Sequence, residues 1–186
     1  ERINETLKEI WEGDIRYAED GAAQELSYLT GNDELDVYSR SMYPLSYDNE
    51  LNRVEVLGAD YLTVDYSGYE YTGGAHGYPY RSHYLFDLTT GEEKTLADLY
   101  QGSVDEFKDI VAQYSVQNWK DNPDPYFGWD SEDAAYADLY DNASLNMLMR
   151  YGTDGIVIEY SPYEYGPYAS GYIGVEIPYE ALNINL

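Results

Sequence analysis

The stretch YLTVDYSGYEY, residues 61–71, decides the fold of this chain. From Leu62 to Ser67, apolar or aromatic residues alternate with polar ones, a period of two that predicts a half-buried strand. The turn formed by residues 58–60 separates it from a similar run at 54–57, and the turn at 89–91 closes a third run at 81–88. These segments predict an antiparallel meander.

Helical periodicity appears on both sides of this meander. Residues 2 to about 25 place apolar side chains on one stripe, which predicts an amphipathic helix. Ser103 and Glu106 have the spacing of a capping box, so a second long helix begins there and ends before Pro123. Shorter elements are expected as a strand within 37–43, helices at 95–99 and 130–140, a hairpin from 145–150 and 156–160, and a last strand at 172–177. The order favours an α+β fold, with antiparallel sheets packed against two long helices.

Charge limits the partners that this chain can have. Thirty-six acidic residues face ten basic ones, giving a net charge of -26. Such a surface repels nucleic acid and anionic headgroups, and it attracts cationic proteins, amines or metal ions. The same acidity also serves solubility alone, an alternative that the sequence leaves open.

Cysteine is absent, so disulfides, thiolate metal sites and thiol nucleophiles are excluded. No apolar run approaches the ~18 residues of a membrane span, and no signal peptide is present, so we expect membrane attachment only through an anchor outside this sequence.

Tyrosine is abundant, with 24 copies, and it is concentrated between two expected strands in YSPYEYGPYASGY, residues 160–172. Prolines and glycines restrict this loop, so its tyrosines would lose little entropy on binding. We therefore predict partner binding by Pro162, Tyr163, Glu164, Tyr165, Pro167 and Tyr168. The alternative is a sheet connection whose tyrosines pack back onto the first helix.

A glycine-rich segment, YTGGAHG at residues 71–77, lies between the second and third expected strands. Its spacing differs from that of a phosphate-binding loop and no lysine follows, so it predicts a structural turn or bulge. The structural motif comprises Gly73, Gly74, His76 and Gly77, with His76 hydrogen-bonded locally to fix the loop.

No catalytic centre emerges from the residues. His76 and His83 are the only histidines, too few for a zinc site without added carboxylates, and no strained nucleophile turn is found. The acidic residues of 121–133 lack EF-hand spacing, so we expect them to form a solvated linker. A weak calcium site on the surface is the alternative. Paired carboxylates for glycoside hydrolysis also stay open. We expect no cofactor, no metal and no enzymatic activity.

Two pairs of segments carry a resemblance to a known family. YTGGAHG with the later DLTTG, and YSPYEYGPYASG with IPYEAL, resemble the RsiV-like domain of unknown function, the extracellular part of a lysozyme-responsive anti-sigma factor. The resemblance covers residues 61–186, and residues 1–60 look like the small companion domain that precedes it, the two forming one compact unit. Tyr165 and Gly166 depart from the pattern, since many members have an Ile-Ala pair there.

The resemblance implies a noncatalytic extracellular or cell-surface sensor domain of a Gram-positive-type bacterium, binding a cationic protein such as lysozyme. In this family the same domain also occurs beside polysaccharide deacetylase modules. The alternative implied is therefore an accessory module that binds cell-wall peptidoglycan through stacked tyrosines.

Overall fold

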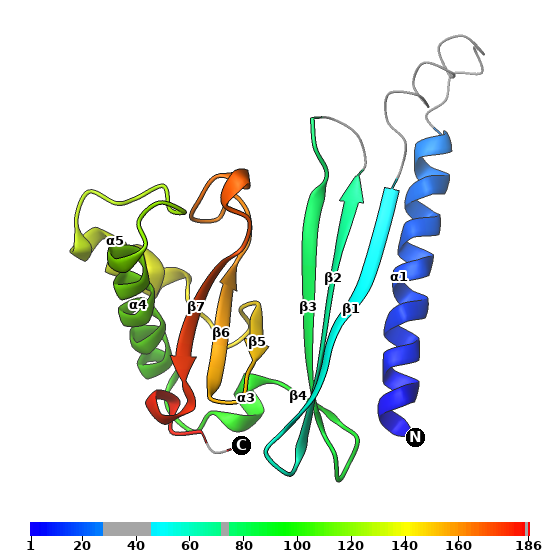
Figure 1. Cartoon of the computed structure of the whole chain (residues 1–186), viewed down its shortest axis with the longest axis horizontal. Helices are drawn as coiled ribbons and strands as arrows, with labels where there is room; N and C mark the ends of the chain where they lie inside the picture. Colours follow the sequence, from blue (N-terminus) through cyan, green and yellow to red (C-terminus); the bar gives the residue numbers. More distant parts are fainter. Residues whose placement is uncertain (28–45, 72–74, 185) are drawn as a thin grey trace.

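The computed structural model describes residues 1–27, 46–71, 75–184 and 186, with the side chains of residues 21–27 outside that description. The strand expected within 37–43 and the glycines Gly73 and Gly74 lie outside the described residues. Figure 1 shows two halves side by side, one built from α1 and β1–β4 and the other from α3–α5 and β5–β7. The α+β fold with antiparallel sheets and helices is thus confirmed.

The first half contains a four-stranded antiparallel sheet in the order β1-β2-β3-β4. Its strands are β1 (Ser46–Leu57), β2 (Tyr61–Tyr71), β3 (Tyr78–Asp87) and β4 (Glu93–Lys94). Gly58 makes the β1–β2 turn with a positive φ of 58°, where a residue without Cβ is favoured. The expected boundary between residues 60 and 61 falls at this turn, between two strands that pair along their whole length.

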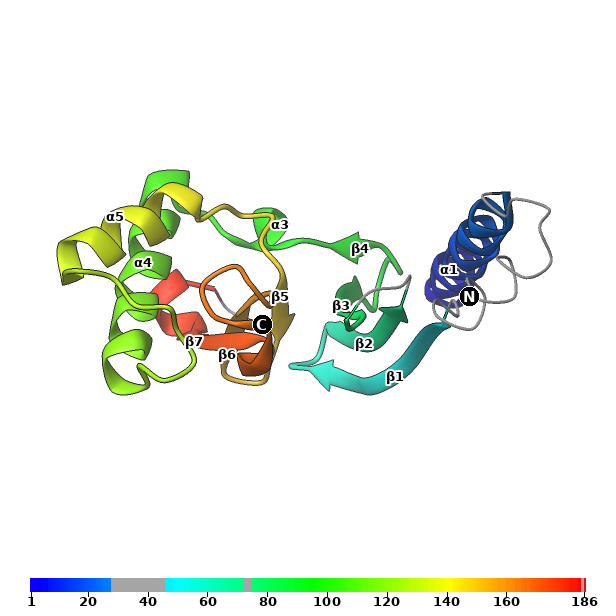
Figure 2. The ribbon, with the colours of Figure 1, turned by 90° about the horizontal axis from the view of Figure 1, so that it is seen from above.

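Helix α1 (Arg2–Ser27) lies along the face of this sheet that points away from the second half (Figures 1 and 2). Polar contacts attach it: Asn49 Nδ2 donates to Asp14 Oδ2 at 2.7 Å, and Tyr17 Oη donates to Glu70 at 3.2 Å. The sequence pattern predicted this helix correctly from residue 2 to about 25.

The second half is built around a three-stranded antiparallel sheet in the order β5-β6-β7. Its elements are α3 (Leu96–Leu99), α4 (Val104–Asp121), α5 (Glu132–Asn142), β5 (Met149–Tyr151), β6 (Gly155–Tyr160), β7 (Ile173–Pro178) and the 3-10 helices η1 (Tyr168–Ser170) and η2 (Tyr179–Leu182). The expected capping box starts α4, since the Ser103 side chain accepts from the Glu106 amide and Glu106 accepts from the Ser103 amide.

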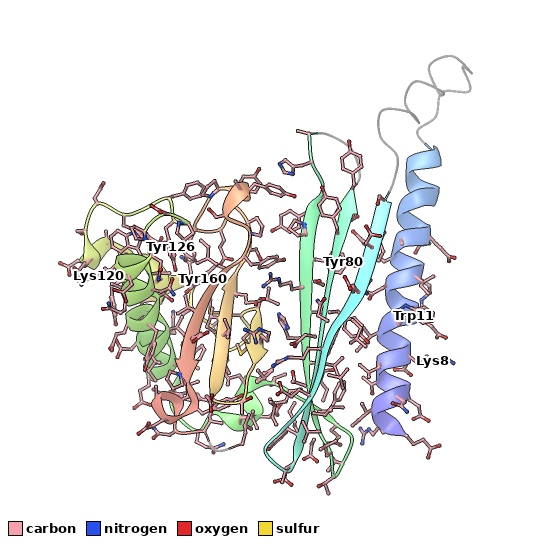
Figure 3. The ribbon with its side chains drawn as sticks, viewed as in Figure 1. Lys8, Trp11, Tyr80, Lys120, Tyr126 and Tyr160 are labelled. Carbon is pink, nitrogen blue, oxygen red and sulfur yellow. The ribbon has the colours of Figure 1, made fainter. Side chains whose placement is uncertain are left out.

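The hydrophobic core lies between α4 and the β5–β7 sheet. Phe107 and Val111 on α4, with Ile158 and Ile177 on the sheet, are completely buried. Beneath the β6–β7 loop, the Tyr160 hydroxyl pairs with Ser115 Oγ at 2.8 Å, which satisfies both groups inside the core. Side chains from both sheets fill the space between the two halves (Figure 3).

An ion cluster joins the two sheets. It comprises Arg53 on β1, Asp65 on β2, Arg81 and His83 on β3, and Glu159 on β6. His83 Nδ1 lies 2.9 Å from Asp65 and Nε2 lies 3.0 Å from Glu159, each measured to a carboxylate oxygen. Because an ionised carboxylate only accepts hydrogen bonds, this geometry fits a doubly protonated imidazolium.

Arginines complete the ion cluster. Arg53 donates to Asp65 at 2.6 Å and to the carbonyl oxygen of Tyr151 in the other sheet, and Arg81 donates to Glu159 at 2.8 Å. The His83 side chain is only 4% exposed, so it joins the two halves instead of facing solvent.

Candidate binding surface

The β6–β7 loop, residues 161–172, is fixed by its own hydrogen bonds. The Tyr163 amide donates to the carbonyl of Gly166 at 2.9 Å, and the Ser161 amide donates to the Glu164 carboxylate at 2.9 Å. Tyr163 adopts a left-handed backbone with φ 73°, and its side chain is 53% exposed. The loop therefore holds an aromatic ring outward at a conformational cost.

The segment 122–131 between α4 and α5 packs against the β6–β7 loop. The Phe127 amide donates to the Tyr165 carbonyl at 2.8 Å. A Cβ on Gly166 would lie 2.0 Å from the Pro125 carbonyl oxygen, so only glycine allows these two backbones to approach as they do. Phe127 is 63% exposed at this junction.

The segment before β3 contacts the loop from the first half of the molecule. His76 Nε2 lies 2.9 Å from the Tyr163 hydroxyl, and its ring stacks on Tyr168 with centroids 3.9 Å apart. The Tyr168 hydroxyl donates to the Gly77 carbonyl at 3.0 Å, and the Gly77 amide donates to Tyr69. His76 Nδ1 also lies 2.8 Å from the Gly77 carbonyl oxygen, so His76 contacts its own turn as well as the loop.

We call four aromatic residues at this end of the two sheets the aromatic crest. The rings of His76, Tyr163 and Tyr168 lie within 6.1 Å of one another by centroid distance, and the fourth residue, Phe127, is attached to the loop by its amide hydrogen bond. Figure 1 shows the β6–β7 loop and the start of β3 at this same end. Because each of the three segments is hydrogen-bonded to the β6–β7 loop or lies within it, the crest is preorganised.

The residues predicted for partner binding are divided between surface and core. Tyr163, Glu164 and Pro167 are exposed and Tyr168 is half-buried. Pro162 is buried, and Tyr165 is only 7% exposed, with its ring against Tyr160 at a centroid distance of 4.8 Å. The loop contacts the segments near residues 76 and 127, and Tyr172 at its end donates to the Pro79 carbonyl on β3 at 3.0 Å.

Sequence reasoning missed Phe127 and Trp129, because it treated their segment as an acidic link. The run PYFGW at residues 125–129 carried the available signal, three aromatic side chains within an otherwise polar stretch.

A pocket of about 430 Å³ opens beside the crest. It is lined by Phe127, Gly128, Trp129, Asp138, Asn142, Glu164 and Tyr165. Trp129 Nε1 donates to Asp138 at 2.8 Å, and Asn142 donates to the other oxygen of the same carboxylate at 3.0 Å. The pocket therefore combines aromatic walls with two carboxylates, and the position of Asp138 is set by two donors.

Within residues 1–27, 46–71, 75–184 and 186, no three His, Asp or Glu side chains gather in an arrangement suited to a metal ion. None of the helices described there combines the length and apolarity that crossing a bilayer requires.

Comparison with known proteins places the chain in a family. A family model described as a protein of unknown function, DUF3298, matches residues 87–180. The chain belongs to the DUF3298 family. The matched residues of this DUF3298 protein contain α4, α5 and the second sheet, together with the β6–β7 loop. No curated protein matches the chain.

Two solved structures resemble the fold of this DUF3298 protein. A DUF3298 family member from Bacteroides fragilis is 22% identical, with a TM-score of 0.61 over 90% of the chain. A DUF3298 family protein from Pseudomonas aeruginosa is 18% identical, with a TM-score of 0.58 over 81% of the chain. The chain spans 66% of the length of each of those two proteins. At these identities the comparison supports the fold, which here includes the first half as well.

Proposed function

We propose that this DUF3298 protein is a noncatalytic extracellular binding domain whose aromatic crest contacts a cationic protein. One observation carries the proposal: Tyr163 and Phe127, 53% and 63% exposed, project from loops that are fixed to each other by backbone hydrogen bonding. Large aromatic side chains on preformed loops provide contact area at a low entropic cost, as in many protein-binding surfaces.

Charge supports a cationic partner. The net charge of -26 would accelerate the encounter with a basic protein, and the crest would then supply short-range contacts. Screening weakens the first contribution at physiological salt, because the Debye length is about 8 Å there. The aromatic contacts persist, so affinity for a true partner falls only partly as salt rises.

The partner that we propose is a lysozyme, on the basis of the RsiV-like motifs in the glycine segment and the tyrosine loop. In that role the chain acts as a cell-surface sensor in a Gram-positive-type bacterium. His83, the buried histidine, has both ring nitrogens against carboxylates, which supports a structural and not a catalytic role for it.

The test is calorimetric titration of the protein with a c-type lysozyme at low and physiological salt, with an unrelated protein of equal basicity as control. Binding to lysozyme alone that survives physiological salt supports the proposal. Equal, salt-sensitive binding of both proteins contradicts it, because net charge would then explain the interaction. Salt-independent retention on purified peptidoglycan, without lysozyme binding, would instead support a cell-wall accessory module.

A further inference from the structure

We propose that the pocket beside the aromatic crest binds an alkylammonium or guanidinium group, presented by a lysine or arginine side chain of the protein partner. This inference rests on the proposed function and names the chemistry by which the surface recognises that partner. It concerns the pocket lined by Phe127, Trp129 and Tyr165 together with Asp138 and Glu164.

The aromatic walls suit a cation. Trp129 and Tyr165 are inclined at 43° with centroids 5.5 Å apart, and Phe127 adds a third ring to the lining. The negative face of an aromatic ring attracts ammonium and guanidinium groups, and tryptophan does so most strongly. Phe127 is 63% exposed, and a bound alkyl chain would cover part of it.

The two charged residues that line the pocket are both acidic. Asp138 accepts from Trp129 and Asn142, and Glu164 accepts from the Ser161 amide at 2.9 Å. An ionised carboxylate has about four lone-pair sites, so these bonds position the charges and still leave acceptor capacity for a ligand. The carboxylates are therefore held in place before a cation arrives, and binding requires little reorganisation.

Glu164 is exposed as a residue, yet neighbouring atoms partly desolvate its carboxyl group. This desolvation raises the pKa of the Glu164 carboxyl above its ordinary value, although the hydrogen bond from the Ser161 amide acts in the opposite direction. A carboxylate that has lost part of its hydration gains more from a neighbouring cation than one fully in water. An anionic ligand would meet the opposite effect from the same two carboxylates.

A small-molecule titration tests the pocket without any protein partner. The indole N–H of Trp129, assigned with Trp129→Phe, is followed by NMR while butylammonium or neutral 1-butanol is added to the protein. We expect a saturable shift with butylammonium at about tenfold lower concentration than with 1-butanol. Equal responses to the two probes would overturn the proposal.

Matched variants locate the charge effect. Glu164→Gln keeps an oxygen that can accept from the Ser161 amide but removes the negative charge, so it should abolish most of the preference for butylammonium. Glu180→Gln, an exposed carboxylate on η2, removes the same charge outside the pocket and should leave the preference unchanged. An unaltered preference in Glu164→Gln would contradict the assignment.

The protein titration separates this inference from the proposed function. Loss of lysozyme affinity in Glu164→Gln, with Glu180→Gln unaffected, supports both. Full lysozyme affinity in Glu164→Gln, which keeps every side chain of the crest, overturns the pocket as the contact and leaves the function standing. Selective butylammonium binding without any lysozyme binding overturns the function and retains the cation pocket.

Discussion

Two tyrosines separated by one residue in the same loop have opposite roles. Tyr163 is 53% exposed and strained at φ 73°, whereas Tyr165 is 7% exposed and packs against Tyr160 and Trp129. A bulky residue with positive φ is costly, and such strain concentrates at functional sites. The conformation of Tyr163 is therefore consistent with a binding residue.

Replacing Tyr163 separates the contribution of the ring from that of the strain. Tyr163→Ala and Tyr163→Gly should both weaken partner binding by about 1–3 kcal/mol, because both remove the exposed ring. The glycine variant should be the more stable of the two by about 1 kcal/mol, because only it adopts positive φ without a Cβ clash. Urea denaturation measures this difference, and equal stability of the two variants would contradict the strained conformation.

Tyr165→Ala should act on the fold. Removal of this buried ring leaves a cavity beside Tyr160 and Trp129 and should lower the free energy of unfolding by about 3 kcal/mol or more. Tyr163→Ala serves as the control, since it removes the same side chain from the surface. A similar melting temperature for the two variants would show that Tyr165 is not part of the core.

At the scale of elements, the proposed binding surface is formed by three segments that meet without sharing a sheet or a helix. The β6–β7 loop contributes Tyr163 and Tyr168, the segment after α4 contributes Phe127, and the segment before β3 contributes His76. The β6–β7 loop and the segment after α4 approach each other at Gly166, where the Pro125 carbonyl oxygen leaves no room for a side chain.

Gly166→Ala should therefore separate the two loops. A Cβ there would overlap the Pro125 carbonyl oxygen, so the variant should lose about 1–3 kcal/mol of stability and most of its partner affinity. Gly13→Ala is the matched control, because its Cβ would meet only the Arg16 side chain at 3.9 Å, and alanine favours a helix. Circular dichroism should show secondary structure retained in both variants, and full affinity in Gly166→Ala would refute the close approach.

The sequence predicts the helices and strands better than the contacts between segments that are distant in the chain. Period-two alternation located β2, and the Ser103–Glu106 spacing located the start of α4, because both signals arise from neighbours in the chain. The contact of Phe127 with Tyr165 and that of His76 with Tyr163 span 38 and 87 residues, 165 − 127 and 163 − 76, and they depend on packing that no local pattern records. The sequence predicted exposed tyrosines in this loop, which holds for Tyr163. It did not predict that Tyr165 is buried or that Phe127 is exposed.

At the scale of the whole molecule, the ion cluster holds the two halves together. His83 contacts Asp65 at a separation of 18 residues and Glu159 at a separation of 76, so sequence reasoning could not pair these groups. Burial disfavours the charged form of each, but the hydrogen bonds and opposite charges outweigh it. The pKa of His83 is therefore raised, while the pKa values of Asp65 and Glu159 are lowered.

The cluster predicts a stability optimum in mildly acidic solution. Protonated His83 contributes fully below its ordinary pKa of 6.5, and that contribution is lost as the pH rises through the raised pKa. Asp65 and Glu159 contribute above their ordinary pKa values of 3.8 and 4.5, and their contribution is lost as the pH falls through the lowered pKa values. The urea midpoint, measured from about pH 2 to pH 9, should therefore be highest near pH 5–6, decline on the alkaline side above pH 6.5 or so, and decline on the acid side below about pH 4.5.

His83→Gln is the informative variant, because glutamine retains hydrogen-bonding groups without the titrating charge. Its urea midpoint should be lower than that of the native protein at pH 5.5 or so, and it should lack the decline on the alkaline side. An alkaline decline of the same size in both proteins would exclude His83 as its cause.

Several contacts along β3 join the first half to the second: His83 in the ion cluster, the hydrogen bond from the Tyr172 hydroxyl to the Pro79 carbonyl, and the contact of His76 with Tyr163 just before the strand. Because these contacts are spread along the strand, they oppose rotation of one half against the other at the crest. If the crest binds the cationic protein that we propose, the partner must match the shape of the crest as well as its charge. Two proteins of equal basicity would then be distinguished by the curvature of their surfaces, a selectivity that attraction between opposite charges alone does not provide.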